Sequence, residues 1–471
     1  MLDTLRKVSK LNPALLASGA AVHASEKNLE NIRAGNLPKV NLTSQAGLDP
    51  SYQNSSTGPG PLGVSLQISQ PIFDGFRTRN LIGQANSQIA GANEDFRGTQ
   101  QTTLLKAASA FIVVSSNRAV LELSNRYEKA ITEQLKTVNS MHSLGDVSGS
   151  DVAEVKMRLA SAQAQTSQAR AALESSIAEY VRVVGEFPSD LATAPAIDRM
   201  LPSSLQAAID TGLRHHPSIF AATRRIEESQ YLVGVAKSDT LPSLSVQGTV
   251  GWDQVAGSES TNSTLVAKLS IPLFDGGGSS ARLQKAKIES TQRQFESKAS
   301  KDAVVAAVAT SWNLLADARY RNRIIDSQVS AAKTALNGIR ESYKMGERST
   351  YDVLNAEQDV SISLINEVLT LRDFKIATYA LAQAMGILDM STLEHTLNQM
   401  PQIQSLQPQF KAAEVENGPV IRRVHKFKLT RANASTTLKS VAFRKSIVDT
   451  PLKFQPSHLE SNLQLRSQSF E

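Results

Sequence analysis

Residues 70–75 read Gln-Pro-Ile-Phe-Asp-Gly and residues 271–276 read Ile-Pro-Leu-Phe-Asp-Gly, so one short motif occurs twice, 201 positions apart. Further pairs keep this spacing: Phe111 and Trp312, Gly145 and Gly346, Asp151 and Asp352. Upstream the spacing is 204, shown by two pairs: Asn12-Pro13 with His216-Pro217, and Leu37-Pro38 with Leu241-Pro242. Matches in one order over most of a chain indicate an internal duplication. The sequence therefore predicts two structural repeats, residues 1–201 and 202–400.

Each repeat has the same predicted order of elements: a helix, two strands, a long helix and a return helix. The strands are expected at about 38–48, 63–73, 242–252 and 264–274. In residues 64–69 every second side chain is apolar and its neighbours are small and polar. Each run has about the 9–11 residues that cross a bilayer as a tilted strand. Half of a soluble antiparallel sheet alternates in the same way, so alternation alone leaves both structures open.

The long helices are expected over residues 78–143 and 279–344, which contain no proline. At 1.5 Å per residue each would reach about 100 Å. Gly145 and Gly346 follow them and suit left-handed C-caps. The return helices are predicted at 150–185 and 351–386, and the first helices of the repeats at 4–34 and 203–237.

Composition narrows the class of protein. Aromatic residues make up 5% of the chain, and there is no cysteine, which excludes disulfides and thiolate metal sites. The net charge of +6 comes from residues 401–471, with 11 Lys or Arg against 5 Asp or Glu. The rest of the chain is balanced, so no nucleic-acid groove is indicated. The basic, proline-containing tail is predicted to be disordered.

Targeting signals are weak. The most apolar run, residues 107–114, is much shorter than the roughly 18 residues of a membrane-spanning helix. Residues 1–10 lack the apolar core of a signal peptide. A membrane-spanning helix is therefore not expected.

No catalytic constellation stands out. His215 and His216 could bind a metal, but adjacent helical residues point in different directions. Residues 276–278 are three glycines without the Gly-Lys-Ser/Thr ending of a phosphate loop, so a strand-to-helix corner is favoured. Asp74 and Asp275 suit helix capping better than an acid/base pair. We therefore predict no enzyme activity, no cofactor and no metal site.

Four amphipathic strands cannot enclose a lumen, and an open sheet in lipid leaves backbone groups unpaired. Three copies of the chain would supply 12 strands and close a barrel. Because both strand ends of each repeat connect to helices, all helices would extend from one side of that barrel. The alternative is a soluble periplasmic coiled-coil adaptor, a binding protein with a single helical hairpin and a compact β domain.

The ordered set of motifs resembles the TolC family of outer-membrane factors. The set comprises Asn-Pro in the first helix, Leu-Pro before the first strand, the Pro-x-Phe-Asp-Gly strand exit and Gly-x-x-(Ser/Thr)-x-x-Asp-Val at the helix turn; residues 343–354 match best. The resemblance implies a homotrimer with a transmembrane β-barrel in the outer membrane and a long α-helical barrel in the periplasm. It also implies export of substrates from a tripartite efflux pump or type I secretion system, with a periplasmic adaptor and an inner-membrane pump or ABC transporter as partners.

The resemblance further assigns a gate to the periplasmic helix tips. Members of the TolC family join an Asp of the first repeat to a Tyr and an Arg of the second. These residues correspond here to Asp151, Tyr343 and Arg348. For Asp151 and Asp352 the simpler interpretation is helix capping.

Two further groups follow from the same resemblance. The family's entrance ring corresponds to Asp352 and to Asn355, which replaces a second Asp, while Glu154 could supply a substitute carboxylate. Adaptor docking is expected at the helix tips: Leu144, Gly145, Met345 and Gly346.

Overall fold

The computed structural model describes residues 1–49, 58–188, 196–255 and 258–399, all within one compact unit. The first repeat contains α1 (Leu2–Leu11), α2 (Pro13–Ala34), β1 (Lys39–Asp49), β2 (Gly58–Phe73), α3 (Arg77–Leu144) and α4 (Gly149–Val184), followed by the short helix η1 (Asp198–Met200). The second contains α5 (Leu205–His215), α6 (Pro217–Ser238), β3 (Ser243–Val255), β4 (Ser258–Ser270), α7 (Gly278–Lys344), α8 (Thr350–Ala384) and α9 (Met390–Gln399). The predicted tail, 401–471, lies outside the described residues.

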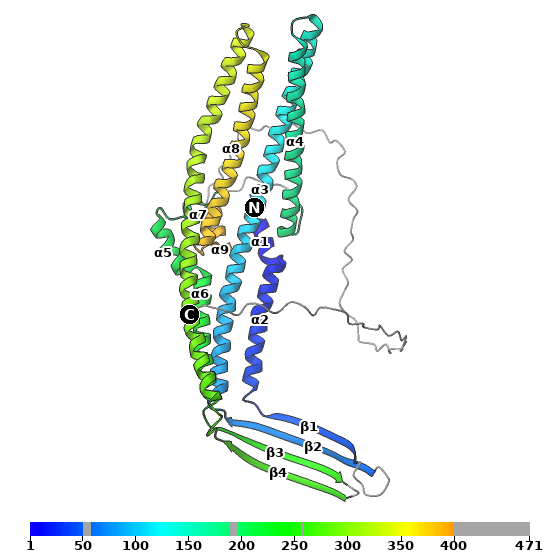
Figure 1. The fold of residues 1–471 in the computed structure, drawn as a ribbon, viewed down its shortest axis with the longest axis vertical. Helices are drawn as coiled ribbons and strands as arrows, with labels where there is room; N and C mark the ends of the chain where they lie inside the picture. Colours follow the sequence, from blue (N-terminus) through cyan, green and yellow to red (C-terminus); the bar gives the residue numbers. More distant parts are fainter. Residues whose placement is uncertain (50–57, 189–195, 256–257, 400–471) are drawn as a thin grey trace, which may run out of the picture. The chain divides into compact units, whose positions relative to one another are not determined.

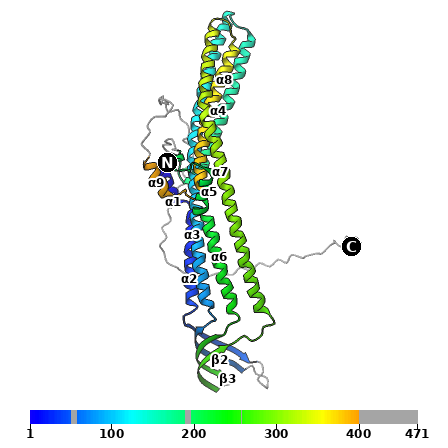
Figure 2. The same ribbon diagram turned by 90° about the vertical axis from the view of Figure 1, so that its left-hand side faces the viewer.

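The long helices occur where the sequence predicts them. α3 has 68 residues and α7 has 67, and the return helices α4 and α8 have 36 and 35. Each long helix packs against its return helix, and α3 also contacts α2, α6 and α8 (Figure 2). The two repeats are thereby joined through α3.

The first helix of each repeat is interrupted, which corrects the prediction of single helices over 4–34 and 203–237. Both breaks fall before a proline, at Asn12 and His216, whose ψ angles of 126° and 124° are extended. A residue before proline is displaced from the helical region by the ring. The side chains of Asn12 and His216 then cap the next helix by accepting from Ala14 N and Ser218 N.

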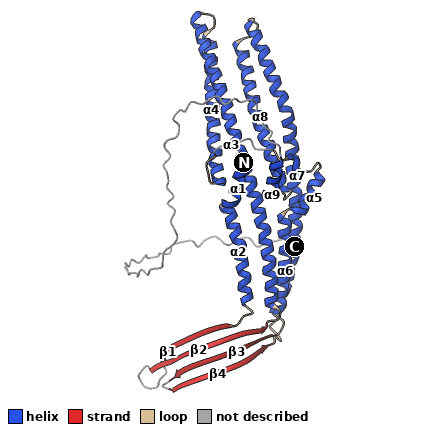
Figure 3. Cartoon of the chain, turned by 180° about the vertical axis from the view of Figure 1, so that it is seen from behind, coloured by secondary structure: helices blue, strands red, loops and turns tan. Residues whose placement is uncertain are grey.

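The four strands form one antiparallel sheet in the order β1-β2-β3-β4 (Figures 1 and 3). Lys39, the first residue of β1, lies opposite Ser69 near the end of β2, and Ser243 opens β3 opposite Ser270 at the end of β4. All four connections to helices therefore leave from the same end of the sheet.

The sheet has one apolar and one polar face, because directly opposite residues in an antiparallel pair point the same way. The apolar face carries Val40, Leu42, Val64, Leu66, Ile68, Val250, Trp252, Leu265 and Leu269. The other face carries Asn41, Thr43, Gln45, Ser65, Gln67, Thr249, Thr264 and Lys268, with Val266 as an exception. This is the alternation that the sequence predicts.

Four strand boundaries differ from the prediction by three residues or more. β2 begins at Gly58 although 63–73 is predicted, and β3 ends at Val255 although 242–252 is predicted. β4 begins at Ser258 and ends at Ser270 although 264–274 is predicted. The end of β2 is supported by β3, with Phe73 opposite Leu244. β4 has β3 as its single neighbour in the described sheet, so its continuation is unpaired, and Leu273 and Phe274 are 91% and 90% exposed.

The largest buried cluster lies where α1, α3, α4, α8 and α9 meet, around Leu5, Phe111, Tyr180, Tyr379 and Leu393. It also accounts for the apolar character of α3. Among the described helices, α3 is long and apolar enough to cross a membrane, with mean hydropathy of 1.3 over an 18-residue window that is 44% buried. Since Phe111 belongs to this cluster, α3 is a core helix.

Candidate functional site

Both long helices end in the same backbone turn. Gly145 has φ of 84° and Gly346 has φ of 78°, a left-handed conformation that disfavours side chains. The following N–H groups reach back into the last turn, from Asp146 to Met141 O and from Glu347 to Ser342 O. The tips expose apolar side chains, with Leu144 77% and Met345 66% exposed. The predicted C-cap glycines are confirmed.

Asp151 and Asp352 cap the return helices. The carboxylate of Asp151 accepts from Ser148 N at 3.0 Å and from Ser148 Oγ at 2.7 Å, while Asp151 N donates to Ser148 Oγ. Ser349 and Asp352 make the same reciprocal pair. Hydrogen bonds from the Ser148 side chain and backbone lower the pKa of Asp151, and bonds from the Ser349 backbone and side chain lower the pKa of Asp352. Both groups are thus held ionised at helix N-termini.

The three predicted gate residues are not brought together within one chain. No hydrogen bond or ion pair joins Asp151 to Tyr343 or Arg348 in the described residues. Arg348 Nη1 lies 4.0 Å from Asp352 Oδ1, and Thr350 Oγ1 donates to Tyr343 OH at 3.4 Å. Asp151 belongs to the α3–α4 hairpin and the other two to the α7–α8 hairpin, whose tips are separate in Figure 1. Their pairing stays a prediction about neighbouring copies.

The residues predicted to form the entrance ring are likewise not brought together as a ring within one chain. Asp352 is engaged in capping, Asn355 accepts a hydrogen bond from Arg158 Nη2, and Glu154 is half-buried. Within the described ranges, no group of three His, Cys, Asp or Glu is arranged to hold a metal ion. A ring of these side chains would require several copies of the chain.

Arg158 makes a contact between α4 and α8 that the sequence did not predict. From α4 it donates to Asn355 Oδ1 and Gln358 Oε1 on α8, and its guanidinium lies 5.8 Å from the ring centre of Tyr351. Its Nε is buried without a hydrogen-bond partner among the described residues. An unpaired buried donor costs about 1–3 kcal/mol. The contact therefore joins the two hairpins near their tips with a reduced net stabilisation.

An apolar contact lies beside Arg158. Leu354 of α8 is fully buried in a cluster of the other hairpin, with Ile131, Val138, Val152 and Val155. Tyr351, Asn355 and Gln358 follow i, i+4 and i+7 spacing, so the sequence does place them on one face of α8. It contains no signal that this face meets Arg158.

The other sequence candidates have structural roles. Asp74 Oδ2 accepts from Thr78 N at 2.7 Å and Asp275 Oδ2 from Ser279 N at 2.6 Å, which confirms capping. The glycines at 276 and 277 have φ of 68° and 88° and form the strand-to-helix corner. His215 Nδ1 contacts Thr211 O, and His216 caps α6.

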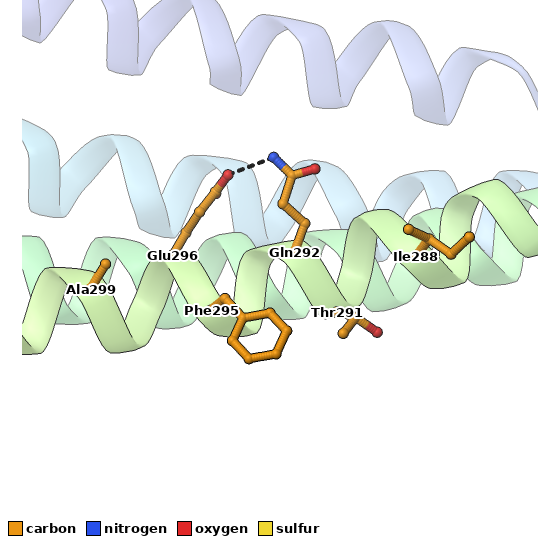
Figure 4. A pocket seen from close by; sticks show the side chains of 6 residues that line it. All are labelled: Ile288, Thr291, Gln292, Phe295, Glu296 and Ala299. Carbon is orange, nitrogen blue, oxygen red and sulfur yellow. Dashed lines mark hydrogen bonds between the residues drawn. The ribbon is translucent and has the colours of Figure 1, made fainter. Parts of the chain in front are cut away.

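The hollow shown in Figure 4 is lined by one face of α7. Its side chains are Ile288, Thr291, Gln292, Phe295, Glu296 and Ala299. Gln292 Nε2 donates to Glu296 Oε1 at 2.8 Å, while Ile288 and Phe295 are largely exposed. This surface is an uncovered helix face rather than an enclosed ligand site.

A sheet with one apolar and one polar face, continued at one end by long helical hairpins, fits an outer-membrane channel protein. The sequence model of the outer membrane efflux protein family matches residues 4–186 and 208–387. The chain belongs to this family. It resides in the outer membrane and serves efflux or secretion as a channel, which the comparisons favour over the soluble adaptor.

Similar proteins support this assignment. The outer membrane efflux protein BepC of Brucella suis is 30% identical over 388 residues, covering 81% of this chain and 84% of that protein. The alkaline protease secretion protein AprF of Pseudomonas aeruginosa is 26% identical over 345 residues, 70% of either chain. A crystal structure of CusC, 16% identical, matches the fold with a TM-score of 0.71 over 82% of this chain and 91% of that one.

Proposed function

We propose that three copies of this chain close a 12-stranded barrel in the outer membrane, continued by a helical tunnel in the periplasm. The observation that carries the proposal is the sheet itself. Its outer strands β1 and β4 each have one neighbour in the described sheet, and its apolar face is separated from a polar one. In lipid such open edges would leave backbone groups unpaired. A closed ring pairs them and turns the polar face toward water.

Three is the number that the strand count favours. Two copies would supply eight strands, and a barrel of about that size is filled by its own side chains. Three copies supply 12, an even number that encloses water. The uncovered α7 face around Ile288 and Phe295 offers apolar surface to a neighbouring copy along the helices (Figure 4).

Mass measurement tests the assembly. The detergent-solubilised protein, corrected for bound detergent, should have three times the mass of the chain and should conduct ions in planar bilayers. The physical reason is that the β1 and β4 edges pair only between copies. A monomer or dimer that conducts ions would contradict the proposal.

The gate is proposed to lie at the tips, where Asp151 of one copy would meet Tyr343 and Arg348 of the next. The single chain supports this by leaving Tyr343 and Arg348 with weak local contacts and by keeping Asp151 ionised. Partly exposed contacts of this kind contribute about 0.5–1.5 kcal/mol each. Three symmetric copies would act together on one closed state.

Changing Arg348→Ser together with Tyr343→Phe is expected to raise single-channel conductance, because the closed state loses its contacts between copies. The mass and thermal stability of the trimer should stay as in the unmodified protein, since Arg348 is exposed, Tyr343 is only partly buried, and neither belongs to a buried cluster of the described residues. Unchanged conductance would mean that these residues have a structural role and that the gate lies elsewhere.

We propose that the partner proteins of the channel bind at the same helix tips. The relatives belong to efflux and secretion systems, which implies an adaptor and an inner-membrane pump. The exposed Leu144 and Met345, with the turns at Gly145 and Gly346, form the surface at which a periplasmic adaptor would dock. The pump, or an ABC transporter, would select the cargo, and lipid of the outer membrane would surround the apolar face of the sheet.

A further inference from the structure

The sheet carries few charged side chains. Among the strand residues whose side chains the structure describes, the charged ones are Lys39, Asp253, Glu259 and Lys268. The remaining strand residues described are apolar, small or uncharged polar. Each of these four charges therefore contributes strongly to the electrostatic potential over the face on which it lies.

Both lysines lie on the polar face of the sheet. Lys39 of β1 directly precedes Val40, and Lys268 of β4 directly precedes Leu269. Val40 and Leu269 belong to the apolar face, and successive side chains along a strand alternate between the faces. Both lysine side chains are exposed, and neither makes an ion pair with another residue that the structure describes.

The two lysines also lie at nearly the same level, near the helix end of the sheet (Figure 3). Lys39 shares a row with Ser69 and Gln247, while Lys268 lies opposite Ser245. These rows are two residues apart along β3, which is about 7 Å at roughly 3.3 Å per residue. The positive charges of one copy therefore lie in one narrow band.

Acidic side chains at the adjoining strand-to-helix corners have partners of their own. Asp239 Oδ1 lies 2.8 Å from Arg77 Nη1, and Asp239 Oδ2 lies 2.9 Å from Arg282 Nε. Asp74 and Asp275 cap the long helices α3 and α7. These carboxylates are thus compensated by arginines and helix N-termini rather than by the two lysines.

In the described part of the sheet, Asp253 is the one acidic side chain on the polar face. It lies opposite Gly63, and its Oδ1 would touch a Cβ added to that glycine, which places the carboxylate over this face. Asp253 is six positions along β3 from Gln247, which is about 20 Å. The Debye length at physiological ionic strength is about 8 Å. Asp253 therefore does not neutralise the lysine band.

We propose that Lys39 and Lys268 make the helix end of the barrel lumen selective for anions. The proposal rests on the proposed trimeric channel, in which the polar face lines the water-filled lumen. Two lysines in each of three copies give a band of six ammonium groups. Such a band raises the local concentration of anions and lowers that of cations. The favoured class of solute is therefore anionic, such as carboxylates and phosphates.

Reversal potentials in planar bilayers test the selectivity. In a gradient of potassium chloride, the variant Lys39→Gln with Lys268→Gln is expected to lower the ratio of chloride to potassium permeability by roughly twofold or more. The Debye length is about 30 Å at about 0.01 M salt, so the effect should be largest in dilute solution. At about 1 M salt it is about 3 Å, and the two proteins should behave alike.

Two matched variants separate charge and face. Lys39→Arg with Lys268→Arg keeps both positive charges and should keep the permeability ratio. Glu259 lies opposite Gln254, which follows Asp253 and so belongs to the apolar face. Glu259→Gln changes the charge of the chain by the same sign as an added lysine, but outside the lumen, and should leave the ratio unchanged.

A cysteine variant tests the charge without depending on a new folding event. The chain has no cysteine, so Lys268→Cys introduces a single thiol per copy. A positively charged methanethiosulfonate, added to the conducting channel, should raise the ratio of chloride to potassium permeability. A negatively charged methanethiosulfonate should lower it, because the same position then carries the opposite charge.

The outcomes distinguish this proposal from the proposed channel. A conducting trimer whose permeability ratio is the same in the double glutamine variant would overturn the anion selectivity and leave the channel intact. Equal effects of the two reagents, or an equal fall of the ratio in Glu259→Gln, would overturn it as well. A monomeric mass without ion conduction in the unmodified protein would overturn the channel itself.

Discussion

Replacing Arg158 with alanine is expected to open the channel. Arg158 of α4 donates to Asn355 and Gln358 of α8 and lies near the Tyr351 ring, so its removal eliminates the polar contacts between the two hairpins near their tips. Hydrogen bonds to a charged group contribute about 1.5–3 kcal/mol. A change of about 1.4 kcal/mol is tenfold in an equilibrium. Part of this loss is offset, because the same change removes the buried Nε that has no hydrogen-bond partner among the described residues. Open probability in planar bilayers should therefore rise, by less than the full value of these bonds.

Two further variants show which property of Arg158 matters. Lys156→Ala removes the same charge from an exposed position on α4 and should conduct like the unmodified protein. Arg158→Lys keeps the charge but loses the planar fork that reaches two acceptors at once. Conductance of Arg158→Lys like that of Arg158→Ala would assign the effect to the hydrogen bonds. If Arg158→Ala left open probability unchanged, the contact would not restrain the gate.

Gly386→Ala is expected to lower the free energy of unfolding strongly. Gly386 has φ of 73°, and an added Cβ would lie 2.5 Å from His216 Cα and 2.8 Å from His215 O. A left-handed alanine costs about 1–2 kcal/mol. Backbone atoms cannot rotate away as a flexible side chain can, so overpacking should add about 1–3 kcal/mol. Thermal unfolding in detergent should show a clearly lowered Tm.

The duplication supplies the matched control, Gly185→Ala. Gly185 is the equivalent residue of the first repeat, with φ of 87° and no neighbouring atom of the described chain within 4 Å of its Cβ position. In this variant the free energy of unfolding should fall only by the cost of a left-handed alanine, about 1–2 kcal/mol. Equal losses of Tm in the two variants would show that the approach of Gly386 to the His216 break contributes nothing.

Local chemistry explains why much of the architecture could be predicted. Capping by Asp74 and Asp275, the C-cap glycines and the long uninterrupted helices depend on residues within a few positions of one another. The alternation of the strands and the duplicated order of elements can also be recognised from the sequence. The interruption at Asn12-Pro13 is local as well, and the X-Pro rule would have located it.

The sequence by itself determined the two repeats, the four-stranded sheet with its two faces, and the family of outer-membrane channels. The tertiary structure alone decided that Arg158 meets Asn355 and Gln358 and that Gly386, but not Gly185, lies against another backbone segment. These contacts join segments about 170–200 residues apart. The physical reason is that periodicity identifies the buried face of a helix, while the partner of that face depends on how the helices pack together.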